Sequence, residues 1–303
     1  MFKNLTLYSF DRTWNLTTAQ VEAGIAQARF LACGATAEQS AGWSEPRGIA
    51  HAVLAESVGD WLIARYTTET KVLPANVVRR AADERAAKLE AQLGRPIGRA
   101  ERRDLREETR LDLLPRAFTR VAHTHIGIDR RRGLLLIDSC AAARTEAIAA
   151  LLMRCLDNLT LTRLTTATSA ATQMAAWLLA HDAPGRFAID EECELRATDD
   201  TGSVVRYSKH SLNNAEVRKH IGAGKLPTRL ALTWNGRVSF VLTEQAQLRR
   251  VRLLDGVLKG RAEEDEEDAA DRFDADWTIT TGEIGALATE LIEALGGMLA
   301  PEA

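Results

Sequence analysis

Apolar and polar positions alternate at two spacings along the chain, and these spacings predict strands and helices in turn. Residues 4–10 alternate as in a strand, and Thr17 or Thr18 is suited to cap the helix that follows. Two further β-like runs cover residues 51–56 and 60–69. The first part of the chain therefore predicts a strand, a capped helix and two more strands.

Two helical patterns lie between residues 76 and 114. The first has a thin apolar stripe that includes Val78 and Ala82, and it ends at Gly94, a residue suited to a helix C-terminus. The second begins after Gly98 and ends before Pro115. Because charged residues dominate both patterns, they predict a charged helical arm over residues 76–114.

The strands in the rest of the chain are predicted to pair mainly as hairpins. Residues 121–128 and 134–139 flank a basic tip, and residues 228–234 and 237–242 flank an Asn-Gly dipeptide, which favours a type I′ turn. This pattern predicts an α+β fold with hairpin-rich mixed sheets. Further predicted elements are helices at 141–158 and 168–181, a β-like run at 160–165, a third strand at 247–254, a short strand at 277–280 and a final helix at 282–295.

Composition is that of a globular protein with a large core. The chain has 303 residues, of which 46% are apolar and 27% charged, and we expect an N-terminal half of residues 1–165 and a C-terminal half of residues 166–303. No apolar run approaches a membrane span and the start lacks a signal-peptide core, so the protein is expected in the cytoplasm. Its four cysteines form no Cys-x-x-Cys pair and are expected to be small buried apolar residues.

Charge is distributed unevenly along the chain, although the net charge is only −3. Residues 71–132 contain 16 Lys and Arg against 9 Asp and Glu, and residues 206–229 contain six against one. Residues 261–276 reverse this balance, with nine acids and two arginines. Separated fields of opposite sign indicate a charged partner, and they say little about the fold.

No constellation typical of an enzyme is present in the sequence. Phosphate-binding glycine loops and the Gly-x-Ser-x-Gly elbow are missing. His123 and His125 would share one strand face, which is a weak metal-site pattern and more typical of an ordinary sheet face. The acidic run 263–268 lacks the glycine spacing of a cation loop and is expected to be solvated. We therefore predict neither catalysis, nor a metal, nor a cofactor.

Arginines give a more specific signal. On a helix, Arg99, Arg103, Arg106 and Arg110 would project within a sector of about 60° and over a length of ~16 Å. Such a stripe fits a row of phosphates, although a solvated helix with salt bridges such as Arg103 with Glu107 is the plain alternative. Other predicted DNA contacts are the hairpin-tip residues Arg130, Arg131 and Arg132 and the strand residues Arg250 and Arg252.

Phe118 lies between two arginines, where it is either an exposed anchor or a core residue at the start of a strand.

The sequence contains no module that reads base edges, such as a zinc finger or a basic region with heptads. Binding through phosphates alone predicts little sequence preference.

Several segments together resemble the recombination-associated protein RdgC family of proteobacteria, over essentially the whole chain. The segments are Phe2-Lys-Asn-Leu5, Lys71-Val-Leu-Pro74, Leu113-Leu-Pro-Arg-Ala-Phe118, His220-Ile-Gly-Ala-Gly-Lys225, Arg272-Phe-Asp-Ala-Asp276, Gly282-Glu283 and Leu291-Ile-Glu-Ala-Leu-Gly-Gly297. Some members have a lysine-rich turn where this chain has Gly94-Arg-Pro-Ile-Gly98, and more basic or amide side chains where this chain has Ser208 and His210.

The resemblance implies a nucleoid-associated protein that binds duplex DNA without sequence preference, with single-stranded DNA as a further candidate partner. It implies a ring-shaped homodimer that encircles DNA and restrains the RecA recombinase by occupying DNA, and a protein that is not an enzyme. It places Arg116 and Phe118 at a dimer interface and Lys209 in a basic DNA-binding segment. The alternative is a protein-interaction module that inhibits the recombinase by direct contact.

Overall fold

The computed structural model describes the whole chain except residues 50–51, 200, 255–256, 258–268 and 300–303. Its contacts divide the chain into two compact units that do not follow chain order. The first unit contains Met1–Gln27, Glu45–Ala64 and Thr124–Ala303, and the second contains Ala28–Ser44 and Arg65–His123. The expected boundary near residue 165 falls inside the first unit and stays a prediction.

The first unit contains an antiparallel sheet in which the strands follow the order β3, β4, β5, β6, β1 and β7. The predicted basic hairpin is confirmed, because β5 and β6 pair on both sides of the turn 130–133. Thr17 caps α1 in a capping box with Gln20, and α4 also contacts α1. The elements are β1 (Thr6–Ser9), α1 (Thr18–Ala26), β3 (Ala55–Val58), β4 (Trp61–Val72), β5 (Phe118–Asp129), β6 (Leu134–Ile137), α4 (Ala142–Cys155) and β7 (Thr162–Arg163). Of β4 and β5, only the residues up to Ala64 and from Thr124 onward belong to this unit.

A second antiparallel sheet of the first unit has the strand order β12, β11, β10, β8 and β9. The predicted type I′ turn joins β10 to β11, with Asn235 at φ 51° and Gly236 at φ 61°. The predicted third strand is β12. The elements are α5 (Ala170–Ala180), β8 (Phe187–Ala197), β9 (Val204–Ser208), α6 (Ala215–Gly222), β10 (Lys225–Trp234), β11 (Val238–Thr243) and β12 (Leu248–Leu253).

The N-terminal segment joins the two sheets of the first unit. Leu5 exchanges backbone hydrogen bonds of 2.7 and 3.0 Å with Leu248 on β12, and the next residues form β1 in the other sheet. Phe2 is buried, and its ring meets that of Trp277 edge-on at 5.0 Å. One apolar core therefore includes residues of both sheets.

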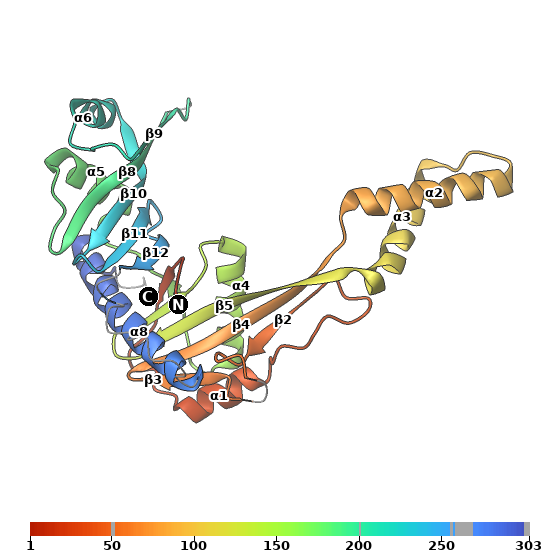
Figure 1. Cartoon of the computed structure of the whole chain (residues 1–303), viewed down its shortest axis with the longest axis horizontal. Coiled ribbons are helices and arrows are strands. Elements are labelled where there is room, and N and C mark those ends of the chain that lie inside the picture. The colour runs from red at the N-terminus through yellow and green to blue at the C-terminus, as the bar shows by residue number, and fades with distance from the viewer. Residues whose placement is uncertain (50–51, 200, 255–256, 258–268, 300–303) are drawn as a thin grey trace. The chain divides into compact units, whose positions relative to one another are not determined.

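The C-terminal part differs from its prediction. A short strand at 277–280 followed by a helix was expected, but residues Ala269–Ala294 form one helix, α8 (Figure 1). Trp277, Ile284, Leu287 and Leu291 recur at helical spacing and are all buried. Burial of this stripe outweighs the local strand preference of the β-branched Thr-Ile-Thr-Thr run.

The second unit combines three strand segments with a helical hairpin. β2 (Gln39–Ser44) pairs with the Arg65–Thr70 part of β4, and the start of β5 lies on the other side of β4. The segment predicted as a charged arm forms α2 (Ala75–Leu93) and α3 (Arg99–Leu113), which lie side by side (Figure 1), followed by the short helix η1 (Leu114–Arg116). Gly94 ends α2 in the left-handed conformation, with φ 63°.

Candidate nucleic-acid interface

The α3 stripe comprises Arg99, Arg103, Arg106 and Arg110, and the helix that the stripe requires is present. α3 begins after Gly98, whose backbone N–H donates to Glu101 at 2.7 Å. Arg99, Arg103 and Arg106 are exposed, whereas Arg110 is half-buried and donates to Glu38 at 2.6 Å. Three arginines of the stripe therefore face solvent, whereas the fourth, Arg110, binds Glu38 in the segment just before Gln39.

Contacts at the base of α3 hold the helix against α2. Glu90 of α2 accepts the backbone N–H of Ile97 at 3.0 Å and a hydrogen bond from Arg102 at 2.8 Å. These two donors lower the pKa of Glu90 below its usual value, so the carboxylate is ionised at neutral pH. At the start of α3, Arg95 similarly lowers the pKa of Glu101 to about 2. Glu90 and Glu101 thus pair with Arg102 and Arg95, which lie outside the stripe.

The surface of α3 is hollowed where the stripe arginines lie. The concavity measures about 1000 Å³ and is lined by Ile97, Arg99, Ala100, Arg102, Arg103 and Arg106. Asp104 lies 3.6 Å from Arg103, and both side chains are well exposed. An exposed ion pair of this length contributes little stability. The arrangement suits a polyanion, because guanidinium groups bind phosphate oxygens bidentately.

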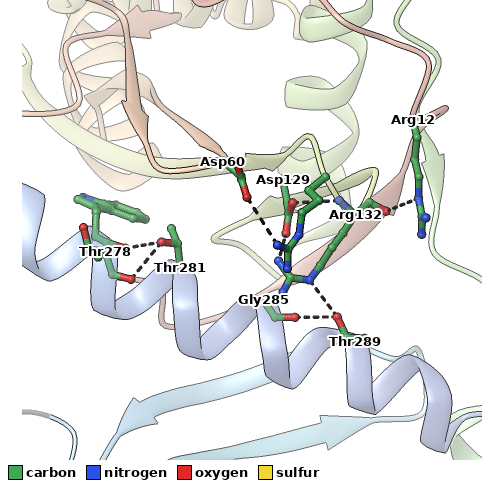
Figure 2. Close-up of polar contacts among 10 residues, drawn as sticks. Arg12, Asp60, Asp129, Arg132, Thr278, Thr281, Gly285 and Thr289 are labelled. Carbon is green, nitrogen blue, oxygen red and sulfur yellow. Dashed lines mark hydrogen bonds and ion pairs between the residues drawn. The ribbon is translucent and has the colours of Figure 1, made fainter.

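The hairpin-tip arginines make contacts within the protein, and Figure 2 shows those of Arg132. Arg132 pairs with the fully buried Asp129 at 2.7 Å and donates through Nε to Thr289 of α8 at 3.0 Å. Gly285 leaves room for it, since a Cβ there would lie 2.9 Å from Arg132 Nη1. Arg130 donates to the Leu16 carbonyl at 3.2 Å. Arg131 lies 3.9 Å from Asp60 and is the most exposed of the three.

The remaining predicted DNA contacts lie on the second sheet and beside it. Arg250 and Arg252 lie on β12, where a bulge against β11 gives Arg250 a φ of 52°. Arg250 also forms an ion pair with Glu192. Lys209 is exposed just after β9. The contact of these three cations with DNA stays a prediction.

The structure decides between the two interpretations of Phe118. The side chain is 87% exposed, which makes it an exposed aromatic at the start of β5 and not a core residue. Arg116 and Arg120 beside it are exposed as well. Large exposed aromatics flanked by arginines are typical of interface anchors. This environment fits the dimer-interface assignment of Arg116 and Phe118, which stays a prediction.

The histidines of β5 occupy ordinary sheet positions. His123 Nδ1 lies 2.9 Å from the Thr67 hydroxyl, and the His125 ring lies 5.3 Å from that of Trp277. Burial lowers the pKa of His123. Within the described ranges, no group of three or more His, Cys, Asp or Glu side chains could hold a metal ion. The acidic run 263–268 lies outside them.

Among the cysteines, only part of the expectation is confirmed. Cys193 is buried in the core, whereas Cys33, Cys140 and Cys155 are partly exposed.

The structure also contains an arginine cluster that the sequence analysis did not predict. Arg196, Arg206 and Arg229 surround a buried acid on the second sheet. Its only sequence signal was the basic composition of residues 206–229.

These features define an α+β protein with two antiparallel sheets and a helical hairpin that exposes arginines. The chain belongs to the RdgC family: the family profile described as "Putative exonuclease, RdgC" matches residues 1–298. It is 40% identical to the recombination-associated protein RdgC of Dechloromonas aromatica, covering 98% of this chain and 97% of that protein. The RdgC proteins of Burkholderia ambifaria and Cupriavidus necator are each 39% identical, covering 98% of this chain and 96% and 98% of theirs.

The two kinds of description differ, because the family profile names a nuclease and the relatives are named for recombination. Both contain the name RdgC, and the name of the relatives connects this family with DNA recombination. Separately, no helix in the described part of the chain is long and apolar enough to cross a membrane.

Proposed function

We propose that this protein binds duplex DNA without sequence preference and acts in recombination by occupying DNA. The observation that carries the proposal is the hollow on α3, where Arg99, Arg103 and Arg106 face solvent together. Arginines that contact backbone phosphates supply affinity and orientation but no sequence information. The proposal extends to single-stranded DNA, whose backbone offers the same phosphate groups.

A homodimeric ring around the duplex is the proposed assembly. Closure of two identical chains needs a self-complementary contact, and the exposed Phe118 with Arg116 is our candidate for one such contact. The net charge of −3 fits a ring with arginines toward the DNA and acids on its outer surface. Bound in this way in the nucleoid, the protein would restrain the RecA recombinase without catalysis.

The salt dependence of duplex binding tests the DNA contact. Replacing Arg99, Arg103 and Arg106 by Ala should weaken binding to all sequences alike and reduce the slope of log K against log salt by up to ~2.7, at ~0.9 for each phosphate that is no longer bound. Arg110 is kept, because its bond to Glu38 is structural. The matched control replaces three arginines of the first unit with the same change of charge: Arg144, Arg154 and Arg163. An unchanged slope in the α3 variant would show that α3 does not bind DNA.

Three further measurements test the assembly and the absence of catalysis. Native mass spectrometry should give twice the mass of 33.2 kDa, and a closed ring should dissociate more slowly from circular than from linear DNA. A monomer at micromolar concentration would exclude the ring. Incubation with plasmid and magnesium should leave the DNA intact, and nicking or degradation would favour the nuclease description.

A further inference from the structure

The solvent face of the second sheet carries a buried acid surrounded by cations. Glu194 on β8 is only 4% exposed, although its neighbours Cys193 and Leu195 point to the opposite, core-facing side. Its cross-strand partners are Arg206 on β9 and Arg229 on β10. The carboxylate therefore lies in the middle of a row that crosses three adjacent strands.

Three guanidinium groups approach this one carboxylate. Arg206 Nε lies 2.6 Å from Oε2, and Arg229 Nη1 lies 3.8 Å from the same oxygen. Arg196, two residues further along β8, places Nη2 3.8 Å from Oε1. The Thr228 hydroxyl also donates to Oε1, at 2.7 Å. Both carboxylate oxygens of Glu194 thus accept a hydrogen bond, while the arginine side chains remain 48% to 72% exposed.

The charges in this cluster do not balance. Hydrogen bonding to Arg206 lowers the pKa of Glu194, so one negative charge faces three positive charges at neutral pH. In the pairs Arg186 with Glu290 and Arg237 with Glu283, by contrast, one acid meets one arginine. Like charges on neighbouring strands repel one another. The cluster therefore retains surplus positive charge and exposed N–H donors.

A phosphate group suits both the surplus positive charge and the exposed N–H donors of this cluster. It is anionic, and its oxygens accept paired hydrogen bonds from the planar fork of an arginine. We propose that Arg196, Arg206 and Arg229, positioned by Glu194, form a phosphate-binding site on the second sheet that uses none of the α3 residues. We assign the phosphate to a nucleic-acid backbone; this source rests on the proposed function, whereas the affinity for phosphate does not.

Duplex binding across a salt series tests the site in the full chain. Changing Arg196, Arg206 and Arg229 together to Gln should weaken binding about tenfold at low salt and reduce the salt slope by ~0.9 to 1.8, for one or two phosphates. Lysine at the same three positions keeps the charge but lacks the fork, so it should restore the slope more than the affinity. The control variant changes the singly paired Arg186 and Arg237 to Gln and should leave the slope unchanged.

The variant Glu194→Gln separates positioning from simple electrostatics. It makes the cluster one charge more positive, so charge alone predicts tighter DNA binding. If Glu194 holds the guanidinium groups in place, binding weakens instead. Tighter binding by a variant with an unchanged circular dichroism spectrum would overturn the positioning role.

Binding of pyrophosphate tests the site without DNA. Together with the DNA measurements, it distinguishes a nucleic-acid backbone from a free phosphate compound as the ligand. It should raise the melting temperature of the wild type but not that of the triple Gln variant. If the wild type fails to bind DNA and this shift remains specific, the proposed function fails and the site binds free phosphate compounds. If the triple variant keeps both the DNA salt slope and the pyrophosphate shift, the inference fails and the proposed function stands.

Discussion

Replacing Arg132 by Gln should destabilise the fold far more than it affects DNA binding. The Arg132 side chain is 24% exposed and that of its partner Asp129 is fully buried. Removing one partner of a buried ion pair costs ~3–5 kcal/mol, because the other charge is left buried without compensation. Asp129 keeps the backbone N–H of Arg132 at 3.0 Å as a donor, so we expect a destabilisation of about 3 kcal/mol, at the lower end of that range.

Urea denaturation of Arg132→Gln and of the neighbouring variant Arg131→Gln measures how much each substitution lowers the free energy of unfolding. Arg131→Gln is the control, since Arg131 is 68% exposed and lies 3.9 Å from Asp60, and such a surface pair contributes less than ~1 kcal/mol. Adding Asp129→Asn to Arg132→Gln should recover part of the stability, because the uncompensated charge is removed. Equal effects of the two single variants, or a weaker DNA affinity with unchanged stability in Arg132→Gln, would refute the reasoning.

Three further outcomes are expected. Burial raises the pKa of Asp138 above its ordinary 3.8, so the stability that the protonated carboxyl contributes is fully present below pH 3.8 and is lost as the pH rises through the raised pKa. Urea titrations should therefore show that Asp138→Asn gains stability relative to the wild type as the pH rises from about 4 to 7, and a constant difference would contradict this. Phe118→Ala should leave the melting temperature nearly unchanged but shift light scattering toward monomer, whereas an unchanged dimer would remove Phe118 from the interface. Burial raises the pKa of the Cys193 thiol to about 12, so a thiol reagent should label Cys193 only after denaturation. Rapid labelling of Cys193 itself in the native protein, located by peptide mapping, would contradict its burial.

Elements with local signals were predictable from the sequence. Asn235 and Gly236 form the expected turn because a type I′ turn requires positive φ at both positions, and Thr17 caps α1 through its own side chain. The α3 helix was predictable for the same reason, together with the direction in which its arginines project. Each of these signals depends on residues close together in the chain.

Features set by contacts between distant residues were not predictable. β8 carries the polar run Asp-Glu-Glu-Cys-Glu, which has no strand-like alternation. Two of its acids, Glu192 and Glu194, pair with arginines of other strands, and the sequence does not show these pairs. The strand expected at 277–280 became part of α8 because its apolar stripe is buried in the core. The sequence predicted Arg132 as a DNA contact at a hairpin tip, but it did not show that the fold brings Thr289 of α8 within hydrogen-bond distance of this side chain.

Recombinase-driven strand exchange in the presence of the α3 variant tests the central claim most directly. The assay uses a DNA concentration at which the wild type coats the duplex, and it compares the wild type with the variant in which Arg99, Arg103 and Arg106 are Ala. Restraint by occupancy predicts that inhibition follows the fraction of DNA covered, so a folded variant that no longer binds DNA should not inhibit. Full inhibition by that variant would contradict the account and would establish direct contact with the recombinase instead.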